Sequence, residues 1–487
     1  MTRLGRVLAG GGPPFYRDLA LLSGGQVLVR LLGFLAFAVL ARRLAPEEYG
    51  AVEYVVGLAL FFSTLVDWGL GPVGVRRAAG DAEALPGLAA QIPAIRLAVA
   101  LVSVPAMALV ALPTAPGSAT PGLVWLFAVS LLAAPWRQVW VLQATGRMGQ
   151  TALAQTVRAA VFALVVVTLA GGPAALVAVG WAEVAAAVAM SLYCVAVQHG
   201  RVTPWRLRPP VRGLGGLFRE GAVVGLGSLV WTANQYAPLL LVASLLGGEE
   251  TAWLAAGVRI AGAFLIFGNL YHFNLYPTMA RGAAGADEGF AETLAASFRV
   301  AAWGGTLAGL ALTVLAEPLC VLVFGRRFEA AAPTLMIVAW GLPIGLLSGH
   351  SRWWLAAAGI QSRVVYSQLA GSLALAVLGP PLVLGLGARG AAVAAVVGAL
   401  AVWGASHALA ARVGGRMPPL AIALAPAGLA AALVVAVQLV GRHDWSNGVA
   451  VVAFALAAPV LDRALLPALT RLGAVRLGPT AAADAPA

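Results

Sequence analysis

The side chains best suited to chemistry in this sequence are six arginines inside long apolar stretches: Arg30, Arg96, Arg137, Arg158, Arg259 and Arg352. A charged side chain at the centre of a bilayer costs roughly 2.5 to 3.5 kcal/mol on insertion scales, so charges that persist there are usually paired or functional. A guanidinium group binds phosphate through two parallel hydrogen bonds. The first chemistry to consider is therefore recognition of a phosphate or diphosphate within a membrane.

Arg30 and Arg259 are the two leading candidates for that role. Arg30 lies about twelve residues into the first apolar stretch, or roughly 18 Å from the face where that stretch begins. Arg259 lies about eight residues into the eighth stretch, which begins at the opposite face, so in a core about 30 Å thick it also lies roughly 18 Å from the first face. Neither has a carboxylate one helical turn away. A water-filled cavity would keep both charged, and the sequence predicts that they bind a diphosphate there; burial against other polar groups is the alternative.

Arg158 and Glu183 lie at similar depths in consecutive apolar stretches. Two interpretations stay open for them. They form a structural ion pair between adjacent helices, or Arg158 contacts substrate and Glu183 binds a coupling proton or sodium ion. Asp67 is a second candidate for ion coupling, although Arg76 or Arg77 is close enough in sequence to pair with it.

The remaining three of the six arginines lie within a turn or two of predicted helix ends. Long side chains at such positions reach the headgroups, so the sequence predicts this role for Arg96, Arg137 and Arg352. Uncharged polar residues in the seventh and eighth stretches either bind sugar hydroxyls or join helices by hydrogen bonds. These further candidates for substrate binding are Asn234, Gln235, Tyr236, Asn269, His272 and Asn274.

The elements that position these residues follow from composition and hydropathy. The chain has 487 residues, of which 61% are hydrophobic and only 10% charged, and its mean hydropathy is +0.90. A membrane-spanning helix needs about 20 mainly apolar residues. The sequence therefore predicts an all-α polytopic membrane protein with about fourteen transmembrane helices, near 18–41, 49–71, 91–112, 121–142, 150–170, 173–197, 220–246, 251–280, 294–316, 330–355, 363–386, 389–411, 419–440 and 447–469.

The distribution of basic residues predicts the orientation. All 31 basic residues are arginines, and nineteen fall in the tails and loops on the side of the termini, against six in the opposite loops. The positive-inside rule places both termini in the cytoplasm, for a multi-pass protein of the cytoplasmic (inner) membrane. The predicted organisation is an N-terminal tail (1–17), an N-lobe (18–197), a basic linker (198–219), a C-lobe (220–411), two additional helices (412–469) and a C-terminal tail (470–487).

The two lobes resemble each other, which predicts a pseudo-symmetric pair of six-helix repeats plus two C-terminal helices. The segment Ala41–Tyr54 shares a Leu and a Glu pair with Ala243–Ala256, and Trp140–Gly146 aligns with Trp353–Gly359. Repeats of this kind are typical of transporters, with the substrate path between the two halves.

Several classes of protein are disfavoured. The chain has no Lys and therefore no phosphate-binding loop that ends in Lys. The predicted external loops have no clustered carboxylates of the kind that a membrane glycosyltransferase or hydrolase would use. Cys194 and Cys320 show no metal-ligand spacing. We expect no enzymatic activity, no cofactor, no metal and no nucleic-acid partner.

The order of motifs along the chain resembles that of polysaccharide-transport (Wzx-type) oligosaccharide flippases of the multidrug/oligosaccharidyl-lipid/polysaccharide exporter superfamily. The resemblance covers roughly 18–412 and rests on "LLSGGQVLVRLLGFLAFAVLARRLAPEEYGAVEY", "LVDWGLGPVGVRRAA", "WVLQATGRM", "AAGVRIAG" and "VLVFGRRFEAAAPTLMIVAW". In addition, "VRLLGF" is similar to a first-span motif of lipid II flippases, which places Arg30 and Arg259 on cavity arginines of that group. A second first-span arginine of those proteins falls on Ala36 here.

The resemblance implies a flippase that moves a polyprenyl-diphosphate-linked oligosaccharide, a precursor of surface polysaccharide or lipopolysaccharide, from the inner to the outer leaflet by alternating access. Its partners would be that glycan, membrane lipids, and a polysaccharide polymerase and glycosyltransferases. The alternatives are a lipid II (peptidoglycan precursor) flippase and a MATE-like exporter of small solutes.

Overall fold

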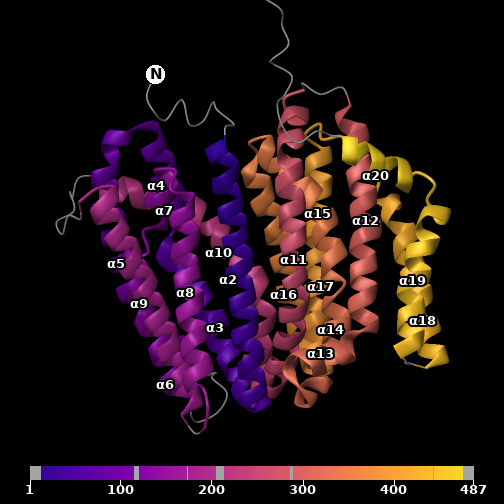
Figure 1. The fold of residues 1–487 in the computed structure, drawn as a ribbon, viewed down its shortest axis with the longest axis horizontal. Coiled ribbons are helices and arrows are strands. Elements are labelled where there is room, and N and C mark those ends of the chain that lie inside the picture. Colours follow the sequence, from indigo (N-terminus) through magenta and orange to yellow (C-terminus); the bar gives the residue numbers. More distant parts are fainter. Residues whose placement is uncertain are drawn as a thin grey trace, which may run out of the picture. The chain divides into compact units, whose positions relative to one another are not determined.

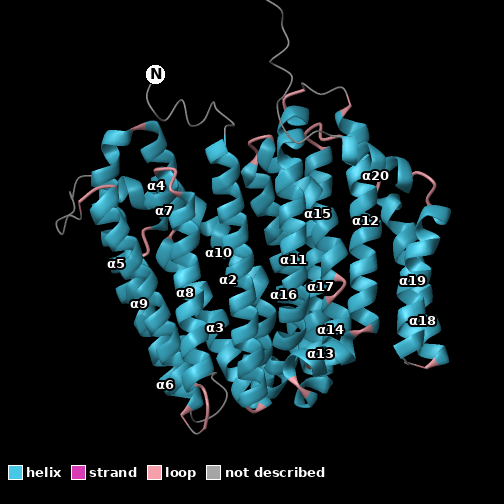
Figure 2. Ribbon diagram, viewed as in Figure 1, coloured by secondary structure: helices cyan, strands magenta, loops and turns pink. Residues whose placement is uncertain are grey.

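The computed structural model describes residues 13–113, 120–172, 174–204, 213–285, 289–441 and 444–474. Within these ranges every regular element is a helix, as the sequence predicts (Figure 2). Parts of the predicted tails and of the predicted linker at 198–219 lie outside the described residues.

Contacts divide the chain into two compact units, Met1–Ala255 and Ala256–Ala487 (Figure 1). The first contains α2 (Pro13–Arg43), α3 (Pro46–Asp67), α4 (Leu70–Gly80), η1 (Ala82–Ala84), α5 (Leu85–Ala111), α6 (Thr120–Ser130), η2 (Leu131–Trp136), α7 (Val139–Ala144), α8 (Met148–Leu169), α9 (Ala175–Arg201), α10 (Leu214–Leu246) and the start of α11 (Gly248–Ala283). The second contains the rest of α11, then α12 (Phe290–Val314), α13 (Ala316–Phe324), η3 (Arg326–Ala331), α14 (Ala332–Val338), α15 (Gly341–Ala357), α16 (Gln361–Leu386), α17 (Ala388–Ala411), η4 (Leu420–Ala423), α18 (Leu424–Val440), α19 (Asp444–Leu461) and α20 (Leu465–Ala474).

This division falls later in the chain than the predicted linker, because α10 packs along α3 and α4 and so belongs to the first unit. In that unit α2 also packs against α8, and α8 against α9. The predicted pair of six-helix repeats stays a prediction.

The number of spans agrees with the sequence. In the described ranges twelve helical segments are long and apolar enough to cross a membrane, and two bent pairs raise this number to fourteen. The bends are 70° between α12 and α13 and 89° between α19 and α20. The predicted span at 447–469 therefore consists of two helices rather than one. The first ends at Leu461, and α20 leaves in a different direction.

The predicted fourth span, 121–142, is also not one regular helix. The α-helix ends at Ser130, a 3-10 segment with Pro135 follows, and α7 begins only at Val139. Proline has no N–H to donate to the helix ladder, which explains a break at this point. The break places Arg137 between two helical segments rather than inside one.

A second break separates α3 from α4. Trp68 and Gly69 both adopt left-handed backbone conformations there, with φ of 51° and 68°. Two glycines one turn apart on α10, Gly221 and Gly225, pack directly against this break. The Trp68 indole stacks on Phe218 with ring centroids 4.9 Å apart, and its Nε1 donates to the Phe218 carbonyl at 3.0 Å. The break and the first turns of α10 therefore form one packed junction.

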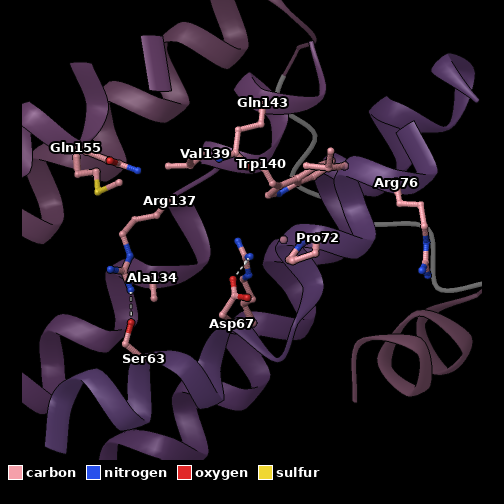
Figure 3. A pocket seen from close by; sticks show the side chains of 14 residues that line it. Ser63, Asp67, Pro72, Arg76, Ala134, Arg137, Val139, Trp140, Gln143 and Gln155 are labelled. Carbon is pink, nitrogen blue, oxygen red and sulfur yellow. Dashed lines mark hydrogen bonds and ion pairs between the residues drawn. The ribbon is translucent and has the colours of Figure 1, made fainter. Parts of the chain in front are cut away.

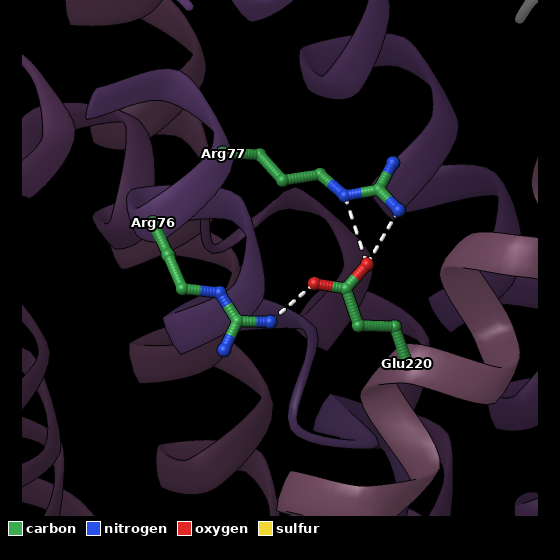
Figure 4. A network of polar contacts seen from close by, with 3 residues as sticks. All are labelled: Arg76, Arg77 and Glu220. Atoms are coloured by element: carbon green, nitrogen blue, oxygen red, sulfur yellow. Dashed lines mark hydrogen bonds and ion pairs between the residues drawn. The ribbon is translucent and has the colours of Figure 1, made fainter. Parts of the chain in front are cut away.

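Two ion pairs reinforce this junction. The carboxylate of Glu220 on α10 accepts hydrogen bonds from Arg76 through one oxygen and from Arg77 through the other (Figure 4). The Nε of Arg77 donates at 2.9 Å. A carboxylate shared by two guanidinium groups forms a small network, which contributes more to stability than an isolated surface pair does.

We expect Gly225→Ala to destabilise the protein. A Cβ at this position would lie 2.8 Å from the Trp68 carbonyl carbon and 2.9 Å from its oxygen, and backbone atoms cannot turn aside as a side chain can. Overpacking of this kind costs about 1–3 kcal/mol, which thermal unfolding in detergent would detect as a lower midpoint.

Gly216→Ala is the matched control on the same helix, because a Cβ there meets nothing within 4 Å. Alanine favours the helix over glycine by about 1 kcal/mol, so this control should be as stable as the wild type or more so. Equal midpoints for the two variants would contradict the packing described.

Candidate anion-binding cavity

The first unit contains a cavity of about 630 Å³ (Figure 3). Its polar lining consists of Ser63, Asp67, Arg76, Arg96, Arg137, Gln143 and Gln155. The lining therefore contains three arginines and one carboxylate. The cavity is within the usual size range for small-molecule sites, about 300–1,000 Å³, and its excess of positive charge favours an anionic ligand.

Asp67 and Arg96 form an ion pair between the end of α3 and the middle of α5. The Arg96 side chain is only 5% exposed, whereas that of Asp67 is 43% exposed and borders the cavity. The Arg96 Nε is buried and has no hydrogen-bond partner. The predicted pairing of Asp67 with Arg76 or Arg77 is wrong, because the break after α3 turns those two arginines toward Glu220 instead.

Arg137 occupies the break between η2 and α7, where the backbone leaves helical geometry (φ −74°, ψ 71°). Its Nη2 donates to the Ser63 hydroxyl on α3 at 2.9 Å (Figure 3). Within the described part of the chain Arg137 forms no ion pair. Of the three cavity arginines, it alone keeps its charge uncommitted to a carboxylate.

The predicted role of headgroup anchor is wrong for two arginines. Arg96 is buried and faces inward, and Arg137 lines the cavity. Depth along the sequence suggested an anchor because both residues lie near predicted helix ends. In the tertiary structure both residues instead line the polar cavity inside the first unit. The third such residue, Arg352, donates from its Nε to the Ser348 hydroxyl at 3.0 Å.

Amide side chains complete the polar lining. Gln155 on α8 hydrogen-bonds Gln26 on α2, which joins the two helices beside the cavity. Arg30 follows Gln26 by four residues, so the two lie on the same face of α2, one turn apart. The Arg30 side chain is exposed. The predicted diphosphate-binding role of Arg30 stays a prediction.

The predicted ion pair between Arg158 and Glu183 is confirmed. The Arg158 Nη2 lies 2.6 Å from the Glu183 Oε1, between α8 and α9. The Glu183 side chain is 12% exposed, and the Arg158 Nε is buried without a hydrogen-bond partner. The geometry supports the structural interpretation. The substrate role of Arg158 and the coupling role of Glu183 stay predictions.

The other candidates are spread over two units. On α10 of the first unit, Asn234 and Tyr236 are half-buried and Gln235 is exposed. In the second unit Arg259 is half-buried, Asn269 and Asn274 are exposed, and His272 is buried. The three polar residues of the eighth span therefore do not share one environment, and their substrate roles stay predictions.

The His272 ring lies 5.0 Å from the His350 ring, beside a buried polar cluster whose particular contacts the sequence did not predict. The Tyr271 hydroxyl hydrogen-bonds the Ser297 hydroxyl at 2.5 Å, and Ser297 Oγ lies 2.9 Å from the Nε2 of His350. The Nδ1 atoms of both histidines face backbone carbonyls, at 2.7 Å for His272 and 3.0 Å for His350. A signal was available, since polar side chains inside apolar spans usually join helices.

The described helices have the length and composition of membrane spans, and the first unit contains an internal site of positive charge. A family described as "Polysaccharide biosynthesis protein" matches residues 15–283, more than half of the chain. The chain therefore belongs to the polysaccharide biosynthesis protein family, in agreement with the resemblance found in the sequence.

Solved structures of low sequence identity share the fold. The lipid II flippase MurJ, in an inward closed conformation, matches with a TM-score of 0.75 and 12% identity, over 93% of this chain and 100% of that one. A multidrug resistance MATE family transporter, inward-facing, matches with a TM-score of 0.64 and 14% identity, over 80% and 98%. A transporter of the MOP superfamily from Pyrococcus furiosus matches with a TM-score of 0.54 and 15% identity, over 82% of this chain and 96% of that one.

These three proteins are transporters or flippases by name. A search of curated protein sequences finds no significant match.

Proposed function

We propose that this protein is a flippase that moves a polyprenyl-diphosphate-linked oligosaccharide, a precursor of surface polysaccharide or lipopolysaccharide, from the inner to the outer leaflet of the cytoplasmic membrane. Both termini lie in the cytoplasm in this proposal, and translocation proceeds by alternating access. The glycan reaches the flippase from glycosyltransferases and passes to a polysaccharide polymerase.

The observation that carries the proposal is the cationic cavity in a member of the polysaccharide biosynthesis protein family. Arg137 presents an uncommitted guanidinium group there, and the amides of Gln143 and Gln155 lie within the same lining. Guanidinium groups suit a diphosphate, and amides suit sugar hydroxyls. Arg30, one turn along α2 from the Gln26 that bonds Gln155, extends this polar surface in the proposal.

The cavity disfavours export of cationic solutes. A cation exporter needs an available carboxylate, whereas the carboxylate that lines this cavity, Asp67, is already paired with Arg96. A role of Asp67 or Glu183 in ion coupling would likewise require an available carboxylate. Each is held by an arginine, so a coupling cation has to compete with a guanidinium group.

The test is translocation by the purified protein in proteoliposomes. We expect it to make a labelled polyprenyl-diphosphate oligosaccharide in the inner leaflet accessible to an impermeant glycosidase, and to leave a cationic dye on its original side. Lipid II is assayed in parallel. Faster transport of lipid II would replace the proposed substrate with that alternative, and transport of the dye alone would overturn the flippase proposal.

We further expect the double variant Arg30→Gln, Arg259→Gln to lower translocation at least tenfold while the protein still inserts and folds, because each change removes one proposed charge-assisted contact to the diphosphate. Each single variant separates the contribution of one residue. A double variant with wild-type translocation would remove Arg30 and Arg259 from the proposed site and leave the cavity of Figure 3 as its basis.

A further inference from the structure

The second unit contains a separate cavity of about 580 Å³, lined by five charged side chains. Arg326, Arg327 and Glu329 come from η3, Glu317 comes from α13, and Arg389 comes from α17. Small side chains, Ala330 and Ala332, form part of the lining. Three positive and two negative charges therefore face one hollow. We call it the mixed-charge cavity.

Two glycine turns fix the charged segments. Gly325 adopts φ of 94° between α13 and η3, and the two residues that follow it are Arg326 and Arg327. Gly387 adopts φ of 64° between α16 and α17 and leads into the first turn of α17, which holds Arg389. L-residues with side chains rarely adopt such backbone angles. The two glycine turns thus fix the backbone that carries the three arginines.

The residues next to these turns are also closely packed. Phe328, between Arg327 and Glu329, is fully buried and anchors η3. A Cβ on Gly390 would lie 1.8 Å from the Leu382 carbonyl oxygen, so only glycine allows this approach of α16 to α17. The backbone that carries Arg389 therefore has little freedom to move.

The charges in the mixed-charge cavity do not neutralise one another. Within the described residues, none of these five side chains forms an ion pair. Arg389 also sits in the first turn of α17, next to the positive end of the helix, where a cation is unfavourable. A ligand that supplies both a negative and a positive group would find opposite charges for each of them here, whereas an anion alone would also face the two glutamates.

The surroundings favour a lipid as that ligand. The two connections that form the cavity join spans nine to ten and eleven to twelve, so both lie at the same end of these helices. Large apolar side chains just before each turn are exposed: Leu322 is 70% exposed and precedes Gly325, and Leu384 and Leu386 are 65% and 55% exposed and precede Gly387. Acyl chains would cover these leucines.

We propose that the mixed-charge cavity binds the headgroup of phosphatidylethanolamine. The phosphate accepts hydrogen bonds from Arg326, Arg327 and Arg389, and the ammonium group donates to Glu317 and Glu329. Arginine is the side chain best suited to phosphate. This site is independent of the proposed transport cavity, which lies in the other unit.

The test measures binding of short-chain phosphatidylethanolamine and phosphatidylglycerol to the purified full-length protein by native mass spectrometry. We expect the wild type to bind phosphatidylethanolamine at least tenfold more tightly, because phosphatidylglycerol offers phosphate without an amine. The triple variant Arg326→Gln, Arg327→Gln, Arg389→Gln should lose at least tenfold for both lipids. The double variant Glu317→Gln, Glu329→Gln should bind both lipids alike.

The matched control is Arg412→Gln, Arg416→Gln, Arg463→Gln, three exposed arginines of the same unit outside the cavity. It should bind like the wild type. All five cavity charges are exposed, so their variants should fold, which size-exclusion profiles verify. Wild-type affinity in the arginine triple variant, or saturation of the site by undecaprenyl diphosphate and not by phosphatidylethanolamine, would overturn the proposal.

Discussion

Replacing Arg137 by Gln should slow translocation of the lipid-linked oligosaccharide about a hundredfold, because a hydrogen bond to a charged group contributes about 1.5–3 kcal/mol. This residue should have the largest effect of the cavity arginines. Arg96 is held by Asp67 and Arg76 is held by Glu220, so neither offers its full charge to a ligand. Among the described residues Arg137 donates only to the Ser63 hydroxyl, which leaves its positive charge for a diphosphate.

The reconstituted flipping assay measures this effect, with two further variants. Arg137→Lys keeps the charge but not the bidentate geometry, and should recover part of the lost rate. Arg201→Gln removes an exposed arginine at the end of α9, outside the cavity, and should leave the rate unchanged. If Arg137→Gln and Arg201→Gln reduced the rate equally, the effect would reflect overall charge and the cavity would lose its assigned role.

The membrane spans were predictable because each is determined by its own stretch of sequence. Apolar stretches of the required length identify the spans, and their number, about fourteen, agrees with the structure. The ordered motifs from 18 to 412 likewise identified the family that the match at 15–283 shows. Neither result required knowing which spans touch.

The cavity was not predictable because its contacts are not local. Asp67 meets Arg96 across 29 residues, whereas the nearby Arg76 and Arg77 turn away through a break that depends on Trp68 adopting a left-handed conformation. A tryptophan carries no sequence signal for such a backbone. The break accommodates packing against the α10 glycines, which come more than 150 residues later in the chain.

The surroundings of Arg137 were not predictable for the same reason. Hydropathy treats 121–142 as one regular span, in which Arg137 lies near an end and reaches the headgroups. Pro135 interrupts that span, and the chain turns Arg137 toward Ser63 on α3. The proline alone was not a sufficient signal, since Pro93, Pro105 and Pro238 lie inside unbroken helices.

The variant Asp67→Asn should destabilise the first unit by about 3 kcal/mol, because it leaves the Arg96 charge buried without its counter-charge. The Arg96 side chain is 5% exposed and its Nε already has no hydrogen-bond partner, so no other described group takes over the charge. The partial exposure of Asp67 places the estimate at the lower end of the range for broken buried pairs. Thermal unfolding in detergent, followed by tryptophan fluorescence, measures the loss.

The double variant Asp67→Asn, Arg96→Gln distinguishes a stabilising pair from a coupling site. Removing both charges eliminates the uncompensated guanidinium, so at least half of the lost stability should return. Glu83→Gln, an exposed carboxylate outside the cavity, is the control and should unfold like the wild type. If Asp67→Asn instead kept wild-type stability but abolished translocation, Asp67 would act in ion coupling, and Arg96 would be the group that a coupling cation displaces.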